Sequence, residues 1–170
     1  MKSAPILVAA AAAGVLTLAT TRSAYALGPV DLEIGAKAGV ATSPFQGGGD
    51  NPMGFGIGAR GGVGVFGFYG GVKFMYYFGA DDVHTTQYGF EGGYSLGFGP
   101  ITIRPQLGIG NITFSGDDNS LSNVYFEPGV TVLVSLIGFY VGADANVLLT
   151  PGLENSQAAL TINAQIGLKF

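Results

Sequence analysis

The chain has 170 residues and a formal net charge of −4 at pH 7, and only 11% of its residues are charged. A soluble domain usually carries about a quarter charged residues, so much of this surface must face something other than water. The absence of cysteine excludes disulfides. Residues 27–170 contain no apolar run of about 18 residues, which excludes a transmembrane helix in that part of the chain.

The first 26 residues have the features of a secretory signal peptide. Lys2 provides a positive start, and residues 4–21 are uncharged and rich in alanine. Ala24 and Ala26 then occupy the two small-residue positions of a cleavage site. We therefore expect residues 1–26 to be removed and residues 27–170 to form one domain. The alternative is an uncleaved N-terminal anchor helix.

Eight segments of the remaining chain alternate apolar and polar side chains. A period of two residues is typical of a β-strand with one apolar and one polar face. Each segment has roughly the ten residues that a tilted strand needs to cross a bilayer. In the second segment the apolar face is predicted to begin at Met53. In chain order the segments are residues 30–40, 53–60, 68–78, 87–96, 101–109, 124–134, 139–147 and 160–170.

Short and long connections alternate between these segments. The connections at 65–67, 97–100 and 135–138 are short, whereas those at 42–52, 79–86, 115–122 and 150–157 are longer and rich in loop-forming residues. This alternation is typical of outer-membrane barrels, which have short periplasmic turns and long extracellular loops. An even strand number then predicts both ends of residues 27–170 on the periplasmic side.

Two prolines interrupt the pattern of neighbouring segments. Pro105 and Pro128 lie within the fifth and sixth segments, and a hairpin centred near residue 118 brings them roughly level. Proline cannot donate a ladder hydrogen bond. We therefore predict a bulge or broken pairing where these two strands meet.

The chain resembles the small eight-stranded outer-membrane β-barrels of the OmpA/OmpX type. Its final segment, ALTINAQIGLKF, resembles the assembly signal of that family, carried here by Ile162, Ile166, Leu168 and Phe170. The resemblance covers residues 27–170 and implies an all-β fold, an eight-stranded antiparallel up-and-down transmembrane β-barrel in a Gram-negative outer membrane. It also implies contact with outer-membrane lipid and lipopolysaccharide, and with the barrel-assembly machinery during insertion. We expect a monomer with no nucleic-acid partner.

The charged residues of the segments all fall on the polar parity, which is the inward face in such a barrel. A base facing lipid at midplane would cost roughly 2–4 kcal/mol, which gives a reason for this segregation. Equal numbers of acids and bases predict a neutral, solvated ionic network inside. The predicted network consists of Glu33, Lys37, Arg60, Lys73, Glu91, Arg104, Glu127, Asp144 and Lys169, and Asp31 shares its parity. The remaining acids, Asp50, Asp81, Asp82, Asp117, Asp118 and Glu154, fall in the long connections.

Three apparent site motifs are better explained by the barrel. The stretches GIGARG at 56–61 and GVGVFG at 62–67 match a dinucleotide fingerprint, but a strand follows them instead of the required helix. His84, the single histidine, has Thr85 and Thr86 beside it but no carboxylate at triad spacing, so we interpret it as a solvated loop residue. The pairs Asp81–Asp82 and Asp117–Asp118 lack the spaced ligands of a calcium loop.

These observations predict a protein with no catalytic residues, no cofactor and no metal site. The leading hypothesis is a non-enzymatic integral outer-membrane protein with a structural or surface-interaction role through its long acidic loops. A narrow porin-like pore for ions or small solutes is the first alternative, and a barrel enzyme that modifies lipid A is the second. A soluble ligand-carrying barrel would need its apolar parity inside.

Overall fold

The computed structural model describes residues 30–44, 51–80, 83–116, 120–152 and 158–170. The predicted signal peptide, residues 1–26, lies outside this part of the chain. Within the described residues no helix is long and apolar enough to cross a membrane. The strands are β1 (Val30–Ala41), β2 (Phe55–Val65), β3 (Phe68–Phe78), β4 (His84–Tyr94), β5 (Leu96–Phe98), β6 (Ile101–Ser115), β7 (Ser120–Leu136), β8 (Phe139–Leu148) and β9 (Ala159–Lys169).

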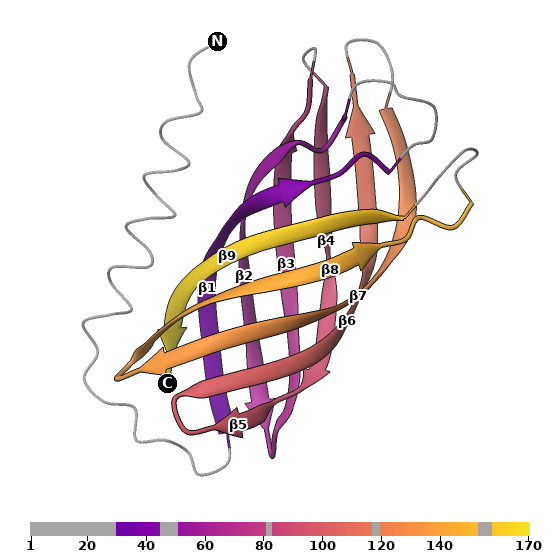
Figure 1. Cartoon of the computed structure of the whole chain (residues 1–170). Helices are drawn as coiled ribbons and strands as arrows, with labels where there is room; N and C mark the ends of the chain where they lie inside the picture. The colour runs from indigo at the N-terminus through magenta and orange to yellow at the C-terminus, as the bar shows by residue number, and fades with distance from the viewer. Residues whose placement is uncertain (1–29, 45–50, 81–82, 117–119, 153–157) are drawn as a thin grey trace.

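These strands form one closed antiparallel barrel (Figure 1). Each strand pairs with the next one along the chain, except that β4 and β5 do not pair with each other, and β1 pairs with β9 over nine residue pairs. The short β5 and the longer β4 both pair with β6, so together they form a single wall strand of the barrel. The predicted all-β, eight-stranded up-and-down barrel is therefore confirmed.

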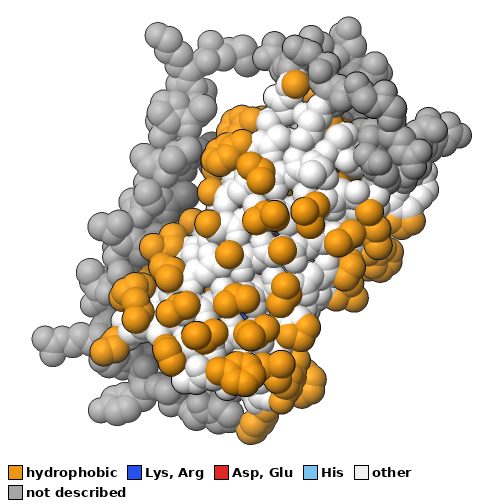
Figure 2. All heavy atoms as spheres, in the orientation of Figure 1, with side chains coloured by type: hydrophobic (Ala, Val, Ile, Leu, Met, Phe, Trp, Pro, Cys, Tyr) orange, Lys and Arg blue, Asp and Glu red, His pale blue; other side chains and the backbone are white. Residues whose placement is uncertain are grey.

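The barrel has its apolar side chains outside and its charged side chains inside. Leu160, Ile162 and Ile166 of β9 are each between 44% and 58% exposed, whereas Arg60 and Lys73 are at most 6% exposed. Figure 2 shows apolar side chains spread over the outer wall. This distribution is the reverse of that in a soluble domain, and a soluble ligand-carrying barrel, which needs an apolar interior along its strands, does not fit it.

Glycines on the inward face accommodate the interior tyrosine rings. The ring of Tyr140 lies against Gly35 of β1 and Gly167 of β9, where an added Cβ would overlap the phenol group. The ring of Tyr69 lies in the same way against Gly62 and Gly71. The many glycines of this chain thus provide the space that large side chains occupy inside a narrow barrel.

The predicted break between the two proline-containing strands is wrong, because β6 and β7 pair without interruption from Ile101↔Val134 to Ser115↔Ser120. The interruptions lie on the other side of each strand. Pairing of β6 with β4 stops at Gly93↔Gln106 and resumes with β5 at Leu96↔Ile103, so the gap is opposite Pro105. Pairing of β7 with β8 stops at Gly129↔Asn146, next to Pro128, and only the bridge Phe126↔Leu149 lies beyond.

The direction of the backbone N–H groups explains this difference. In an antiparallel strand these groups point alternately to one neighbour and then to the other. Phe126 exchanges two hydrogen bonds of 2.8 Å with Leu149 of the β8 side, so the position of Pro128, two residues on, faces β8 as well. Ser135 of β7 donates to Pro100 O at 2.7 Å, so the backbone nitrogen of position 100 also faces β7. Because the direction alternates along the strand, the nitrogen of Pro105, five residues on, points away from β7.

Two further predictions are corrected at the loop end of the barrel. Met53, expected on the outward face of a strand, precedes β2 and is completely buried inside, because the chain turns at Gly54 with a φ of 35°. His84, expected in a solvated loop, is the first residue of β4 and is half-buried. Its ring stacks on Tyr76 at a centroid distance of 5.4 Å.

Candidate functional site

The lumen is the place where the barrel brings its charged residues together. Eight of the nine residues predicted for the interior network are less than 7% exposed, and they form four acid–base pairs. The fold therefore matches every buried charge of the described strands with an opposite one. The pairs are Lys37–Asp144 at 2.9 Å, Arg60–Glu91 at 2.7 Å, Arg104–Glu33 at 2.7 Å, and Lys73–Glu127.

Two arginines and one tyrosine organise the half of the lumen near the short turns. Arg104 forms a bidentate pair with Glu33, with hydrogen bonds of 2.9 and 2.7 Å. The guanidinium carbon of Arg104 lies 3.9 Å from the ring centre of Tyr69, and that of Arg60 lies 4.9 Å from it. The hydroxyl of Tyr69 donates to Glu91 at 3.0 Å. Tyr69 thus connects the two ion pairs into one rigid cluster.

Two carboxylates organise the middle of the lumen. Asp144 accepts hydrogen bonds from Asn146 at 2.6 Å, Asn163 at 2.9 Å and Gln165 at 3.3 Å, in addition to its pair with Lys37. Glu127 accepts bonds from Gln87 at 3.2 Å and Thr161 at 3.1 Å, in addition to its pair with Lys73. The amide and hydroxyl donors around both carboxylates therefore add hydrogen bonds to the two ion pairs.

The ninth predicted network residue lies at the mouth of the barrel. Lys169 Nζ is 3.2 Å from Asp31 and 3.5 Å from Glu33, and the side chains of Lys169 and Asp31 are 22% and 51% exposed. Next to it, Phe170 and Leu32 exchange two backbone hydrogen bonds of 2.9 Å, which extend the β1–β9 seam to the last residue. Of the predicted assembly-signal residues, Ile162 and Ile166 face outward and are exposed, and Leu168 and Phe170 are half-buried.

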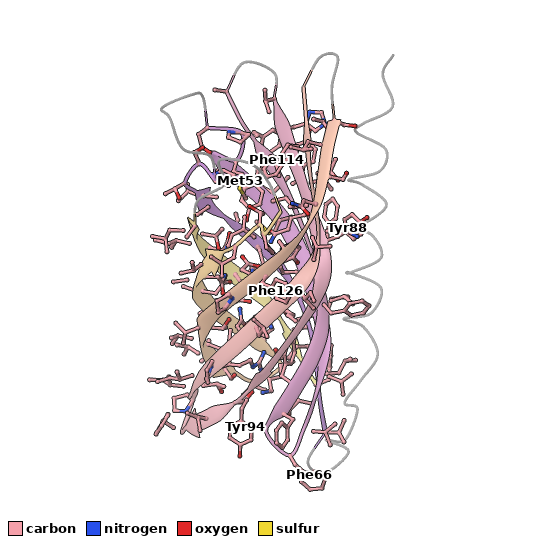
Figure 3. The ribbon with its side chains drawn as sticks, turned by 90° about the vertical axis from the view of Figure 1, so that its right-hand side faces the viewer. Met53, Phe66, Tyr88, Tyr94, Phe114 and Phe126 are labelled. Atoms are coloured by element: carbon pink, nitrogen blue, oxygen red, sulfur yellow. The ribbon has the colours of Figure 1, made fainter. Side chains whose placement is uncertain are left out.

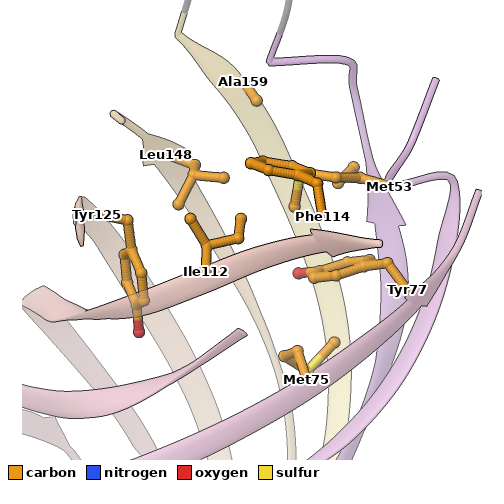
Figure 4. Packing of buried hydrophobic residues seen from close by; sticks show 9 residues of the cluster. Met53, Met75, Tyr77, Ile112, Phe114, Tyr125, Leu148 and Ala159 are labelled. Atoms are coloured by element: carbon orange, nitrogen blue, oxygen red, sulfur yellow. The ribbon is translucent and has the colours of Figure 1, made fainter. Parts of the chain in front are cut away.

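A cluster of buried apolar side chains lies at the loop end of the lumen and was not predicted from the sequence. We call this group the apolar plug (Figure 4). Ile112 and Phe114 come from the end of β6, and Leu148 from the end of β8. The full set is Ala41, Met53, Met75, Tyr77, Ile112, Phe114, Tyr125, Leu148 and Ala159, and each is at most 6% exposed.

A change in polarity at the end of β6 was the available signal for the plug. The period of two continues through residues 111–115, but Asn111, Thr113 and Ser115 now occupy the outward parity while Ile112 and Phe114 occupy the inward one. The last residues of β6 therefore have polar side chains outside and apolar side chains inside, the reverse of the rest of the strand. The charged residues of the predicted network therefore lie in the part of the lumen below the plug.

The described residues do not assemble a catalytic or metal-binding constellation. His84 stacks on the outer wall, whereas Thr85 is buried and donates to Pro52 O at 2.7 Å. No group of three or more His, Cys, Asp or Glu that could hold a metal ion occurs in the described part of the chain. The acidic pairs Asp81–Asp82 and Asp117–Asp118 lie outside it. Both glycine-rich stretches lie in β2 and its turn, and β3 follows them directly.

Comparison with known proteins identifies the fold and leaves the sequence family open. No family model matches the chain, and no curated protein matches it. Among solved structures, the N-terminal β-barrel domain of Pseudomonas aeruginosa OprF has a TM-score of 0.62 at 14% identity, covering 82% of this chain and 97% of that one. Neisserial surface protein A (NspA) has a TM-score of 0.60 at 13% identity, covering 84% and 98%. Both structures are eight-stranded outer-membrane barrels, and this chain has the same fold.

Proposed function

We propose that this protein is an integral outer-membrane barrel with a sealed lumen and a non-enzymatic role in the envelope or at the cell surface. The band of exposed apolar side chains is suited to contact with lipid chains. The charged inward face of the strands is accommodated in the barrel interior because its acids and bases form ion pairs. Residues 1–26 would direct export, and Ile162, Ile166, Leu168 and Phe170 would be read by the barrel-assembly machinery.

The apolar plug is the observation that favours a sealed barrel over a pore. Eight strands enclose only enough room for side chains to fill. A dry apolar constriction also opposes the passage of hydrated ions. Below the plug, Arg104 and Glu33 connect opposite walls of the lumen. The plug and this ion pair both argue against the pore hypothesis.

The long loops then carry the interaction with the surroundings. These loops contain the six acidic residues that lie outside the predicted strand segments, and they contain no lysine or arginine. We place these loops outside the cell and both ends of residues 27–170 in the periplasm. Lipopolysaccharide would surround the loop end, and the monomer would be the functional unit, because all four interior ion pairs form within one chain.

Membrane fractionation with a heat-modifiable gel shift tests the location, and planar-bilayer recording tests the sealed lumen. We expect the folded protein in the outer-membrane fraction and no stable conductance steps. Steps in the native protein that vanish on Arg60→Ala or Glu91→Ala would contradict the sealed lumen and favour the pore. Mass spectrometry of lipid A from cells with and without the protein tests the enzyme alternative, and we expect identical spectra.

A further inference from the structure

The three short turns carry exposed apolar residues at the tip or directly beside it. Each is a two-residue turn, closed by the pairs Val65↔Phe68, Phe98↔Ile101 and Leu136↔Phe139. Phe66 is 73% exposed, Phe98 is 60% exposed, and Ile137 is fully exposed. The turns and their flanks, residues 65–68, 96–101 and 134–139, contain no charged residue. Turns in water are usually built from Asn, Asp and Gly, so this composition needs a reason.

The backbone at Phe66 makes the choice of an aromatic residue still more unusual. Phe66 has a φ of 51° and Gly67 has a φ of 85°, so both central residues are left-handed. Asn–Gly is the preferred pair in such a turn, and a bulky residue at the first position costs free energy. In water, an exposed Phe66 side chain would contribute no stability to offset the free-energy cost of its backbone conformation. It becomes favourable if the turn tip lies in an apolar environment.

The height of the apolar wall points to the same environment. The outward side chains of β3 are apolar or aromatic from Phe68, next to the first turn, to Phe78, and the strand has 11 residues. Ten steps of about 3.3 Å, tilted by about 40°, span about 25 Å along the barrel axis, which is the height of the lipid-facing band in outer-membrane barrels. The band therefore begins at the turns themselves. Figure 3 shows Phe66 at this end of the barrel and Phe114 at the other.

At the opposite end β6 and β7 continue beyond the apolar band. The outward side chains of β6 change from Ile109 to Asn111, Thr113 and Ser115. Thr113 and Ser122 of β7 form a hydrogen bond of 2.8 Å on this exposed wall. The wall formed by β6 and β7 thus projects from the band on the loop side, whereas the short turns carry no such polar extension.

From these features we infer that the three turn tips are immersed in the phospholipid leaflet at the short-turn end, so that the barrel ends within the membrane on that side. This inference rests on the proposed membrane location. The charged mouth residues Asp31 and Lys169 favour lipid over a docked protein as the occupant. Lipid covers only the outer rim and leaves the central mouth wet, whereas a protein docked across this end would cover both.

Single tryptophans can measure the depth of the tips, because the chain contains no tryptophan. Ile137→Trp and Phe66→Trp report on two turns, and Phe90→Trp, at a 69% exposed position in β4, reports on the middle of the band. Ser122→Trp marks the polar wall. Each full-length variant is placed in phosphatidylcholine vesicles that contain lipid brominated either near the headgroup or near the chain end, and aqueous iodide is the opposing quencher.

We expect both tip variants to be quenched most by the shallow bromine, and Phe90→Trp most by the deep one. Iodide should quench Ser122→Trp strongly and the tip variants weakly. If iodide quenches the two tip variants as strongly as Ser122→Trp, the inference is overturned. Quenching of Phe90→Trp by the brominated lipid would still support the membrane location in that case. Tips shielded from both quenchers would indicate a covering second copy and also overturn it. If Phe90→Trp itself escapes lipid quenching, the proposed location fails as well. Ile137→Trp suffices if Phe66→Trp does not fold, because Ile137 has no packing to disturb.

Discussion

Individual glycines determine how closely the interior rings approach the barrel wall. Gly56 of β2 lies directly beneath the ring of Tyr77, a member of the apolar plug, and an added Cβ would overlap only atoms of that ring. Gly70 of β3 faces outward, and an added Cβ there would meet no atom within 4 Å. The two glycines therefore form a matched pair, since both lie in strands but only one has a packing role.

Gly56→Ala should lower the free energy of unfolding by about 1–3 kcal/mol, because overpacking displaces the Tyr77 ring. Gly70→Ala should change it by less than about 1 kcal/mol, in the stabilising direction, because alanine loses less backbone entropy than glycine. Denaturant unfolding in lipid vesicles, followed by the heat-modifiable gel shift, measures both. Equal effects of the two substitutions would contradict the close packing of Tyr77 on Gly56.

At the scale of the strands, the two prolines show how one missing N–H acts on one neighbour alone. Pro105 weakens the contact of β6 with the junction of β4 and β5, and Pro128 weakens the contact of β7 with β8. The β6–β7 hairpin between them, which contains the longest strands of the barrel, remains continuous. Local weak points can therefore lie on both sides of a strongly paired hairpin.

Pro105→Val should restore a donor toward Tyr94 and raise the amide-exchange protection of Ser95 and Leu96. The gain in stability should be about 1 kcal/mol, the usual net value of one hydrogen bond. Pro128→Val is the reciprocal control, since it should raise protection in β8 near Val147 and leave β4 and β5 unchanged. Exchange measured by NMR in micelles would contradict this account if Pro105→Val raised protection in β7 instead.

At the scale of the whole molecule, ion pairs hold opposite walls of the barrel together. In the order of strands around the barrel, β1 and β6 lie four strands apart, and the bidentate pair of Glu33 and Arg104 spans this distance. Such a pair does not need to add net stability, because desolvation of both charges offsets their attraction. Removal of one partner, however, leaves a buried charge with too few counter-ions.

Arg104→Met should therefore lower the free energy of unfolding by about 3 kcal/mol, at the lower end of the range for broken buried pairs because Lys169 lies 3.5 Å from Glu33. The double substitution Glu33→Leu with Arg104→Met should recover most of this loss, since no charge is then left unpaired. Lys169→Met, at the partly exposed mouth, should cost less than about 1 kcal/mol. Denaturant unfolding of the unsubstituted protein and the three variants in vesicles checks these values, and a double variant as unstable as Arg104→Met would contradict them.

Much of the barrel could be read from the sequence because side-chain parity is a local property of a strand. The alternation in residues 160–170 already indicated which side chains face lipid, and the parity of the charges indicated that Arg60, Lys73 and Asp144 turn inward. The separation of short turns from long loops was equally local. None of these predictions requires knowledge of which strands meet.

Other features depended on the register and closure of the barrel, which only the tertiary structure decides. The sequence contains Glu33 and Arg104 as two charges of inward parity, but their pairing follows from strands that lie opposite each other. The plug forms because the tilted strands bring Met53, Phe114 and Leu148 to one level from distant parts of the chain. The neighbour that each proline weakens likewise depends on the direction of a ladder N–H. Parity is set by consecutive residues, whereas pairing across the lumen is set by strand tilt and stagger, which arise only when the barrel closes.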